Sequence, residues 1–443
     1  MTSQTETGLA FLLSLSWLFL IATLILLTYV ILRSRYLFVK PSMIFALFFH
    51  VQIQWPSIVY WYRIADNLTN PAPFFILAQL FPFLLVSGSL LIGRNTAKDV
   101  YARVLRLPGS SPGAILFPLL PLSLVSLVIV GWYLWTVPWD QSGLHAVLFH
   151  PEKAKMAREQ SLKLLTNKYL KYAVSIFNSS IAPVLACLLG FKALDFWRRR
   201  RYVHMGVVLL GVAPILVAVS LSGARGPGVM VILTTLLSIF LLRGLPLQPV
   251  RITMILLAVL IIPGALELLR MGGNFSPSEI VDRYAVIVER VLGYGMTVDA
   301  QWHVEYVTRY GFWGIAGVEK LAPLFGVQPL DILNIVGRYY TEPSATISAN
   351  ASVIFLYYAC FGMLALPLCL LLSWLLDTVL LLYRKMHTIM LPVAIAACGI
   401  AAANLAHTAY TTIFITHGFM IVLALCFFLD VLIARLNPSA SIA

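Results

Sequence analysis

The glycine-rich stretch at residues 220–228, SLSGARGPG, combines a single cation with a flexible backbone. Its arginine, Arg225, stands among three glycines, between the uncharged apolar runs 203–221 and 229–242. Glycines let backbone N–H groups approach a ligand closely, and a guanidinium fork matches the oxygens of a phosphate. We therefore predict an anion-binding turn between two helices. The plainer alternative is a hairpin whose arginine extends to the lipid headgroups.

A second concentration of ionisable and aromatic side chains lies in the longest polar insertion, residues 267–350. Its members include the cations Arg270, Arg283, Arg290, Arg309, Lys320 and Arg338, the acids Asp299, Glu305 and Glu342, and also His303, Trp302, Trp313, Tyr339 and Tyr340. Aromatic rings stack on the C–H faces of sugars and guanidinium groups hold phosphate oxygens, so this mixture predicts a ligand that carries both. The alternative is a solvated surface with internal ion pairs such as Glu279–Arg283.

Short helices are expected to position these side chains. A capping box at Ser276 and Glu279 predicts a helix over 280–292, which Gly293 ends. Further helices are expected over 300–309 and 329–336. Together they would form a small helical cap on the outer ends of the membrane spans.

The composition is that of a membrane protein. The 443 residues are 60% hydrophobic and only 11% charged, and the apolar residues come in long continuous runs rather than in short alternating ones. This pattern predicts an all-α polytopic membrane protein. In such a chain a net charge of +13 reports topology and contact with anionic lipid rather than nucleic-acid binding.

We predict about eleven membrane-spanning helices. They are 8–32, 41–62, 73–93, 113–137, 169–194, 203–221, 229–242, 252–266, 351–376, 389–405 and 411–433. The chain would thus divide into three regions. Residues 1–266 carry eight spans and an outer segment at 138–168 with a surface helix from Pro151, residues 267–350 form the large outer loop, and residues 351–443 carry three more spans.

Basic residues in short connections predict the orientation. The four arginines at 198–201 and Lys40 belong to the connections rich in Lys and Arg, which mark the cytoplasmic side. The N-terminus would then lie outside and the C-terminus inside, with Arg225 facing outward. Asp377 and Asp430 would lie near inner ends of spans.

Several classes of protein are disfavoured. The five cysteines all lie within apolar runs and show no CxxC spacing, so we expect neither a disulfide nor a metal site. The span interiors carry almost no charge, which argues against an ion-coupled transporter, and His50 is interpreted as a packed, hydrogen-bonded side chain. The sequence has no P-loop, HExxH or GxSxG motif.

Four features together resemble a known group of membrane enzymes. They are the number of spans, the SGARGPG turn, the large outer loop before the last spans, and Asn350 at the start of a span with Tyr357-Tyr358 and Phe361-Gly362 after it. The chain resembles the bacterial oligosaccharide repeat-unit polymerases of the Wzy type, which are related to the O-antigen ligases. A ligase-like histidine is expected just before that late span, but residues 344–350 read SATISAN, which favours the polymerase.

The resemblance implies a GT-C-like fold in the bacterial inner membrane and glycosyl transfer at its outer face, without metal or cofactor. The donor would be a glycan on polyprenyl pyrophosphate, and the acceptor a hydroxyl of a second lipid-linked repeat unit. The product would be O-antigen, capsule or exopolysaccharide. A chain-length regulator and a flippase of the same pathway are the implied partners, together with the lipid bilayer.

On this interpretation the candidate catalytic residues are Arg225, His303, Glu305 and Arg309. Arginines would stabilise the charge on the departing pyrophosphate, with Arg225 the first choice and Arg270 and Arg309 next. His303, Glu305 or Glu342 would be the base. The candidate substrate-binding residues are Arg270, Arg283, Arg290, Arg338, Tyr339, Tyr340, Glu342 and Asn350.

Two alternatives stay open from the sequence. One is the sister ligase activity, in which a whole glycan is transferred to another acceptor. The other is a flippase or exporter of lipid-linked glycans, for which a cationic cavity deep among the spans would be expected.

Overall fold

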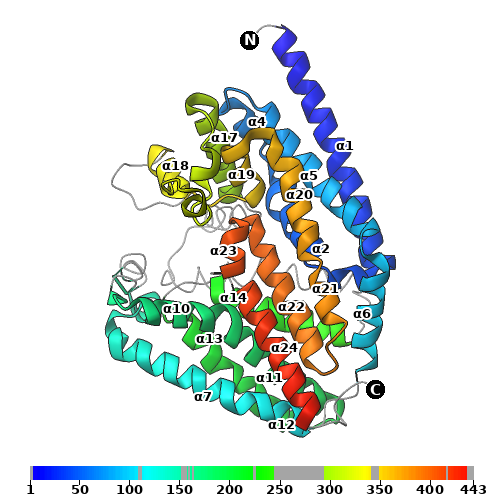
Figure 1. The fold of residues 1–443 in the computed structure, drawn as a ribbon, viewed down its shortest axis with the longest axis vertical. Helices are drawn as coiled ribbons and strands as arrows, with labels where there is room; N and C mark the ends of the chain where they lie inside the picture. Colours follow the sequence, from blue (N-terminus) through cyan, green and yellow to red (C-terminus); the bar gives the residue numbers. More distant parts are fainter. Residues whose placement is uncertain are drawn as a thin grey trace, which may run out of the picture. The chain divides into compact units, whose positions relative to one another are not determined.

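The computed structural model describes residues 3–107, 112–150, 157, 160–161, 164–222, 226–243, 294–340, 349–415 and 418–436. All regular secondary structure within these ranges is helical (Figure 1). Eight of the described helices are long and apolar enough to cross a membrane. They are Thr7–Arg33, Pro41–Val59, Ala72–Leu91, Pro118–Thr136, Lys168–Arg198, Tyr202–Ser220, Val353–Tyr383 and Tyr410–Arg435. The chain is therefore an all-α, multi-pass membrane protein, as predicted.

The eight helices coincide with eight of the predicted spans. Two further predicted spans correspond to the shorter apolar helices Pro227–Leu242 and Met390–Ala406. The remaining one, 252–266, lies outside the described residues.

Contacts divide the chain into two compact units. Unit 1 comprises Met1–Arg94, Pro246–Thr378 and Ala403–Thr411, and unit 2 comprises Asn95–Leu245, Val379–Ala402 and Thr412–Ala443. The predicted division at 266 and 350 stays a prediction.

The helices of unit 1 are α1 (Ser3–Arg33), η1 (Arg35–Val39), α2 (Pro41–Phe49), η2 (His50–Gln54), α3 (Trp55–Val59), α4 (Trp61–Asp66), α5 (Ala72–Leu91), α17 (Tyr294–Tyr310), η6 (Gly314–Gly317), η7 (Ala322–Phe325), α18 (Ile332–Tyr340), α19 (Val353–Phe361), η8 (Gly362–Leu364), α20 (Ala365–Leu376) and η9 (Asn404–Ala406). Helix α5 is the centre of this unit, because it packs against α1, α2 and α20 (Figure 1). Its 20 residues give it a length of about 30 Å, which matches the hydrocarbon core of a bilayer. Gly88 lets α20 approach closely, because a Cβ at this position would overlap the Trp374 ring.

A buried ion pair lies at the Leu91 end of α5. The ammonium of Lys40 lies 3.0 Å from a carboxylate oxygen of Asp377 and also donates to the carbonyls of Ser89 and Ile92. The Asp377 carboxylate accepts two further hydrogen bonds, from the amide and the hydroxyl of Ser42. All three ammonium hydrogens are thus used, and the Lys40 side chain is completely buried. The pair thus connects the start of α2 with the end of α5 and with the residue that follows α20.

A polar network interrupts the apolar interior of unit 1 at η2, a π-helical turn within the second span. His50 Nδ1 lies 2.7 Å from Gln54 Oε1, which confirms that this histidine is packed and hydrogen-bonded. The Gln54 amide donates to the Thr23 hydroxyl and to the carbonyl of Gln79. Gln79 donates in return to the Gln54 carbonyl and to Ser57. These bonds satisfy polar groups that would otherwise be costly among apolar spans.

Unit 2 contains most of α6 (Arg94–Arg106) and the helices α7 (Pro112–Thr136), η3 (Trp139–Gln141), α8 (Gly143–Phe149), α10 (Lys168–Ile176), η5 (Phe177–Ile181), α11 (Ala182–Arg198), α12 (Tyr202–Leu210), α13 (Val212–Ser220), α14 (Gly226–Arg243), α21 (Val379–Tyr383), α22 (Met390–Ala403), α24 (Phe419–Leu436) and most of α23 (Tyr410–Ile415). Helix α11 packs against α7, α12 and α14. The carboxylate of Asp430, on α24, accepts hydrogen bonds from the amides of His387 and Thr388 and from the Thr388 hydroxyl, just before α22 begins. This cross-helix cap satisfies amides near the start of α22 and joins α22 to α24.

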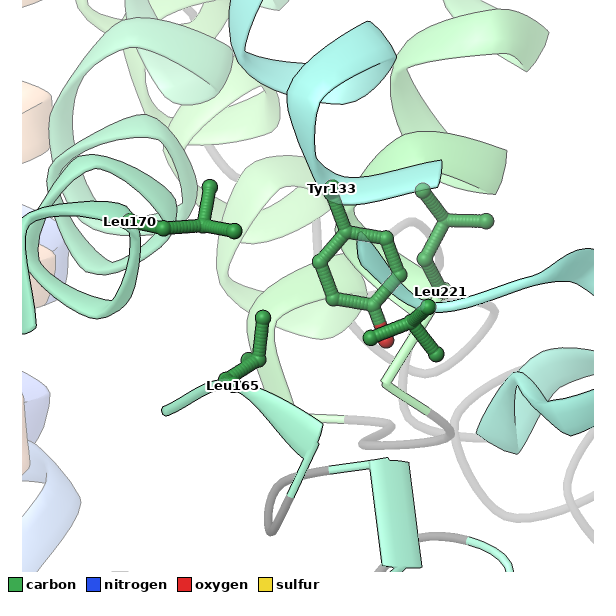
Figure 2. Packing of buried hydrophobic residues seen from close by; sticks show 5 residues of the cluster. Tyr133, Leu165, Leu170 and Leu221 are labelled. Atoms are coloured by element: carbon green, nitrogen blue, oxygen red, sulfur yellow. The ribbon is translucent and has the colours of Figure 1, made fainter. Parts of the chain in front are cut away.

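A hydrophobic cluster fixes the entry to the glycine-rich turn. The cluster contains Tyr133 at the end of α7, Leu165, Leu170 at the start of α10, Leu221 after α13, and Val137 (Figure 2). The Leu221 carbonyl also accepts a hydrogen bond from the Leu144 amide of α8. Helices α13 and α14 contact each other, as expected of a tight hairpin. Arg225 itself lies outside the described residues.

Candidate functional site

Helix α17 carries the described part of the predicted site. Its buried residues include Ala300, Val304 and Val307. They allow it to pack against α5, α19, α3 and η2, and η2 lies inside the second span. Helix α17 therefore packs on helices of three spans, and its place in a cap on their outer ends stays a prediction. The predicted helix at 300–309 is confirmed and extended at its start by two turns, to Tyr294.

The second predicted helix of this region begins later than expected. Helix α18 covers Ile332–Tyr340 rather than 329–336. The carboxylate of Asp331 accepts hydrogen bonds from the amide and the side chain of Asn334, so Asp331 is the N-cap and the helix starts after it. The later start places Arg338, Tyr339 and Tyr340 in the last turn of the helix.

A buried carboxylate and a half-exposed guanidinium form the polar centre of the site. Arg309 Nε lies 2.7 Å from Glu305 Oε1, one helical turn apart on α17. The Glu305 side chain is only 2% exposed, whereas that of Arg309 is 51% exposed. Thr69, in the loop before α5, donates its amide and hydroxyl to the two Glu305 oxygens over 2.7 and 2.6 Å. Glu305 thus joins α17 to the Ala72 end of α5 and orients Arg309 toward solvent.

The electrostatics agree with an ionised Glu305. Burial acts to raise the pKa of its carboxyl, but the bonds from Thr69 and the guanidinium of Arg309 outweigh burial and lower the pKa below its usual value. A carboxylate with three hydrogen bonds and a lowered pKa is a weak base. The geometry therefore fits Glu305 as the residue that orients Arg309, and its prediction as a general base stays a prediction.

Aromatic rings surround this ion pair. The centroid of the Tyr306 ring lies 4.7 Å from that of Tyr310 and 5.3 Å from those of Trp313 and Tyr339. The rings of Tyr310 and Tyr339 are 5.4 Å apart. Trp302 stacks on Tyr340 at 5.4 Å with an angle of 9° between the ring planes. The Tyr310 hydroxyl donates to the Tyr339 oxygen over 2.9 Å. That bond and a second one from Arg309 lower the pKa of Tyr339.

His303 and Asp299 occupy a different part of α17. The imidazole of His303 is completely buried, and its Nε2 donates to the Ala349 carbonyl over 2.9 Å. Burial lowers the pKa of His303 to about 4, so the ring is neutral. Asp299 accepts a hydrogen bond from the Asn350 backbone, and burial raises its pKa to about 7. The two side chains hold the segment that leads into α19, and the role of His303 as a base stays a prediction.

The structure thus brings four of the predicted site residues together: Glu305, Arg309, Tyr339 and Tyr340. Arg338 is exposed on α18, and Asn350 is exposed in the segment before α19, where its backbone bonds to Asp299. Arg225, Arg270, Arg283, Arg290 and Glu342 lie outside the described residues, as does the predicted helix at 280–292. Thr69 could not be predicted as part of the site, because it lies in a short polar turn, NLTNP, with no signal that would pair it with residue 305.

The part of the chain that the structure describes contains no group of three or more His, Cys, Asp or Glu side chains that could hold a metal ion. No known protein family matches this chain, and neither does any characterised protein or solved structure.

Proposed function

We propose that this protein is a membrane glycosyltransferase that joins oligosaccharide repeat units carried on polyprenyl pyrophosphate, at the outer face of a bacterial inner membrane. The observation that supports the proposal is the arrangement around Arg309. A buried glutamate orients the arginine toward solvent within a group of tyrosine and tryptophan rings, next to the end of the span α5. Rings and guanidinium groups at a membrane surface suit a glycan attached to lipid.

The reaction needs positioning more than it needs a strong base. The bond between the anomeric carbon and the pyrophosphate oxygen breaks, and its electron pair leaves with the polyprenyl pyrophosphate. The hydroxyl of the acceptor sugar forms the new bond to that carbon. Its proton passes to the departing pyrophosphate, and arginines stabilise the charge of this leaving group. Arg225 is the proposed arginine for that role, and Arg309 positions the glycan.

The proposal includes the finer architecture. Eleven spans would be completed by the shorter helices Pro227–Leu242 and Met390–Ala406 together with 252–266. The N-terminus would face the periplasm and the C-terminus the cytoplasm, in a GT-C-like arrangement. A flippase and a chain-length regulator of the same pathway would be its partners.

The experiment that tests the proposal is deletion of the gene, followed by analysis of the surface glycan and of the lipid-linked intermediates. Loss of the length ladder, with single repeat units still reaching the outer face, is the expected result. Single units confined to the inner face would show a flippase instead. Full-length polymer left on its lipid carrier would show a ligase, and an unchanged ladder would refute the proposal.

A further inference from the structure

We infer that the surface formed by Arg309, Tyr310 and Tyr339 binds an uncharged sugar unit of the glycan, and that the pyrophosphate binds at a different place. This inference rests on the proposed function and names the ligand chemistry of the same site. It departs from the sequence interpretation, in which Arg309 was a candidate for holding the pyrophosphate.

The charge of the site argues for a neutral ligand. Arg309 already has a full counter-charge, because the ionised Glu305 carboxylate lies 2.7 Å from its Nε. The ion pair has no net charge, so its attraction for an anion falls off much faster with distance than that of an unpaired arginine. A pyrophosphate at this position would also meet the negative charge of Glu305. An uncharged sugar meets no such penalty.

The hydrogen-bonding groups that remain suit sugar hydroxyls. The Nε of Arg309 is used by Glu305, but half of the side chain is exposed. The guanidinium carries four further N–H donors on its two terminal nitrogens, and it also donates to Tyr339. The Tyr339 oxygen accepts from Tyr310 and Arg309, so its own O–H hydrogen is left to donate. Donors from two neighbouring groups match the adjacent hydroxyls of one sugar ring.

The aromatic rings provide the apolar half of such a site. Tyr310 is 59% exposed and Tyr339 is 42% exposed, and their rings meet at 79° with centroids 5.4 Å apart. Two exposed rings at nearly a right angle offer a face and an edge to the C–H groups of a sugar. Exposed rings favour a ligand with apolar C–H surface over a strongly hydrated phosphate.

The Glu305–Arg309 ion pair is also held in place by the fold. Glu305 is fixed by two hydrogen bonds from Thr69 of another segment, so Arg309 is oriented by the fold before any ligand binds. A second carboxylate–arginine pair with the same i,i+4 spacing has a more exposed carboxylate. Arg199 lies 3.0 Å from Asp195 on α11 and is 50% exposed, but Asp195 is 19% exposed. Arg199 therefore provides a matched control for Arg309.

The test is glycan binding by the full chain in lipid nanodiscs, on an array of neutral and uronic-acid-containing oligosaccharides. We expect retention of a neutral oligosaccharide that excess inorganic pyrophosphate does not displace. Tyr310→Ala should weaken that binding about tenfold, which corresponds to the loss of one stacked aromatic contact. Tyr310→Phe should keep most of it, and Tyr172→Ala, at a tyrosine of similar exposure on α10, should leave it unchanged.

Glu305→Gln gives a readout that a merely structural role would not change. The variant removes the counter-charge of Arg309, so inorganic pyrophosphate should now compete with the oligosaccharide, whereas it should not compete in the wild type or in Asp195→Asn. Circular dichroism melting of each variant checks that the fold is intact.

The inference is overturned if no neutral oligosaccharide is retained, if pyrophosphate displaces it from the wild-type chain, or if Tyr310→Ala binds normally. These outcomes are distinguishable from a failure of the proposed function. A ladder lost on gene deletion together with pyrophosphate-sensitive binding would leave the polymerase proposal standing and refute the neutral-sugar site. Neutral-glycan binding with an unchanged ladder would refute the polymerase proposal and leave the neutral-sugar site standing.

Discussion

Replacing Lys40 with methionine should destabilise unit 1 severely, although the two side chains have similar lengths. The Lys40 ammonium is fully buried, and its partner Asp377 has a side chain that is only 5% exposed. Removal of one member of a buried ion pair leaves the other charge uncompensated, which typically costs about 3–5 kcal/mol. The carbonyls of Ser89 and Ile92 also lose a donor each.

The double variant Lys40→Met/Asp377→Leu should recover most of this loss. It removes both charges and fills the site with apolar groups, which is often neutral or even stabilising in a buried position. Ser42 and Ser89 keep each other as hydrogen-bond partners, because their hydroxyl oxygens lie 2.7 Å apart. The loss of stability in the double variant should therefore be far smaller than the sum of the losses in the two single variants.

The assay is unfolding of the purified chain in mixed micelles by titration with sodium dodecyl sulfate, followed by circular dichroism, for both single variants and the double variant. The control is Arg199→Ala, which breaks a half-exposed ion pair and should cost less than about 1 kcal/mol. If the double variant is as unstable as the sum of the single variants, then the pair does not hold the three spans together as we describe.

The remaining predictions concern α17 and α5. The pKa of His303 is lowered to about 4, so the unfolded chain takes up a proton first as the pH falls from 6.5, and this group costs stability between pH 6.5 and 4. The pKa of Asp299 is raised to about 7, so the folded chain keeps its proton longer and the cost appears as the pH rises from 3.8 to 7. The free energy of unfolding, measured across this pH range, should fall with rising pH in His303→Gln and increase with rising pH in Asp299→Asn. The same direction in both variants would contradict the assignment. Gly88→Ala should cost about 1–3 kcal/mol, because its methyl group would overlap the Trp374 ring, whereas Gly131→Ala, which has open space, should not lower the melting temperature. Equal melting temperatures for the two variants would show that α5 and α20 do not meet at Gly88.

The sequence predicted the membrane spans well because each span is a local property. A run of about 20 apolar residues is required by bilayer thickness whatever the run packs against. Helix α17 was also visible as a helix. The elements that pack against α17 could not be predicted, because amphipathic spacing shows that a helix has a buried face but not which elements cover that face.

The chemistry of the site was predicted only in part, for a related reason. Glu305 and Arg309 are one helical turn apart, so their pairing is readable from the sequence. Thr69 lies 236 positions from Glu305, and only the folded chain brings them together. The same holds for Lys40, which the sequence presents only as one of the basic residues in the predicted cytoplasmic connections, whereas the structure pairs it with Asp377.

The role proposed for Arg309 is to position the glycan during polymerisation. Complementation of a deletion strain tests this role most directly. A strain that lacks the gene is complemented with the wild type, with Arg309→Ala or with Arg199→Ala, and the length ladder of its surface glycan is compared at equal protein levels. Hydrogen bonds to a charged group contribute about 1.5–3 kcal/mol, so Arg309→Ala should slow polymerisation about ten- to hundredfold and leave mainly single repeat units. Arg199→Ala should restore the full ladder. A full ladder from Arg309→Ala would contradict the account.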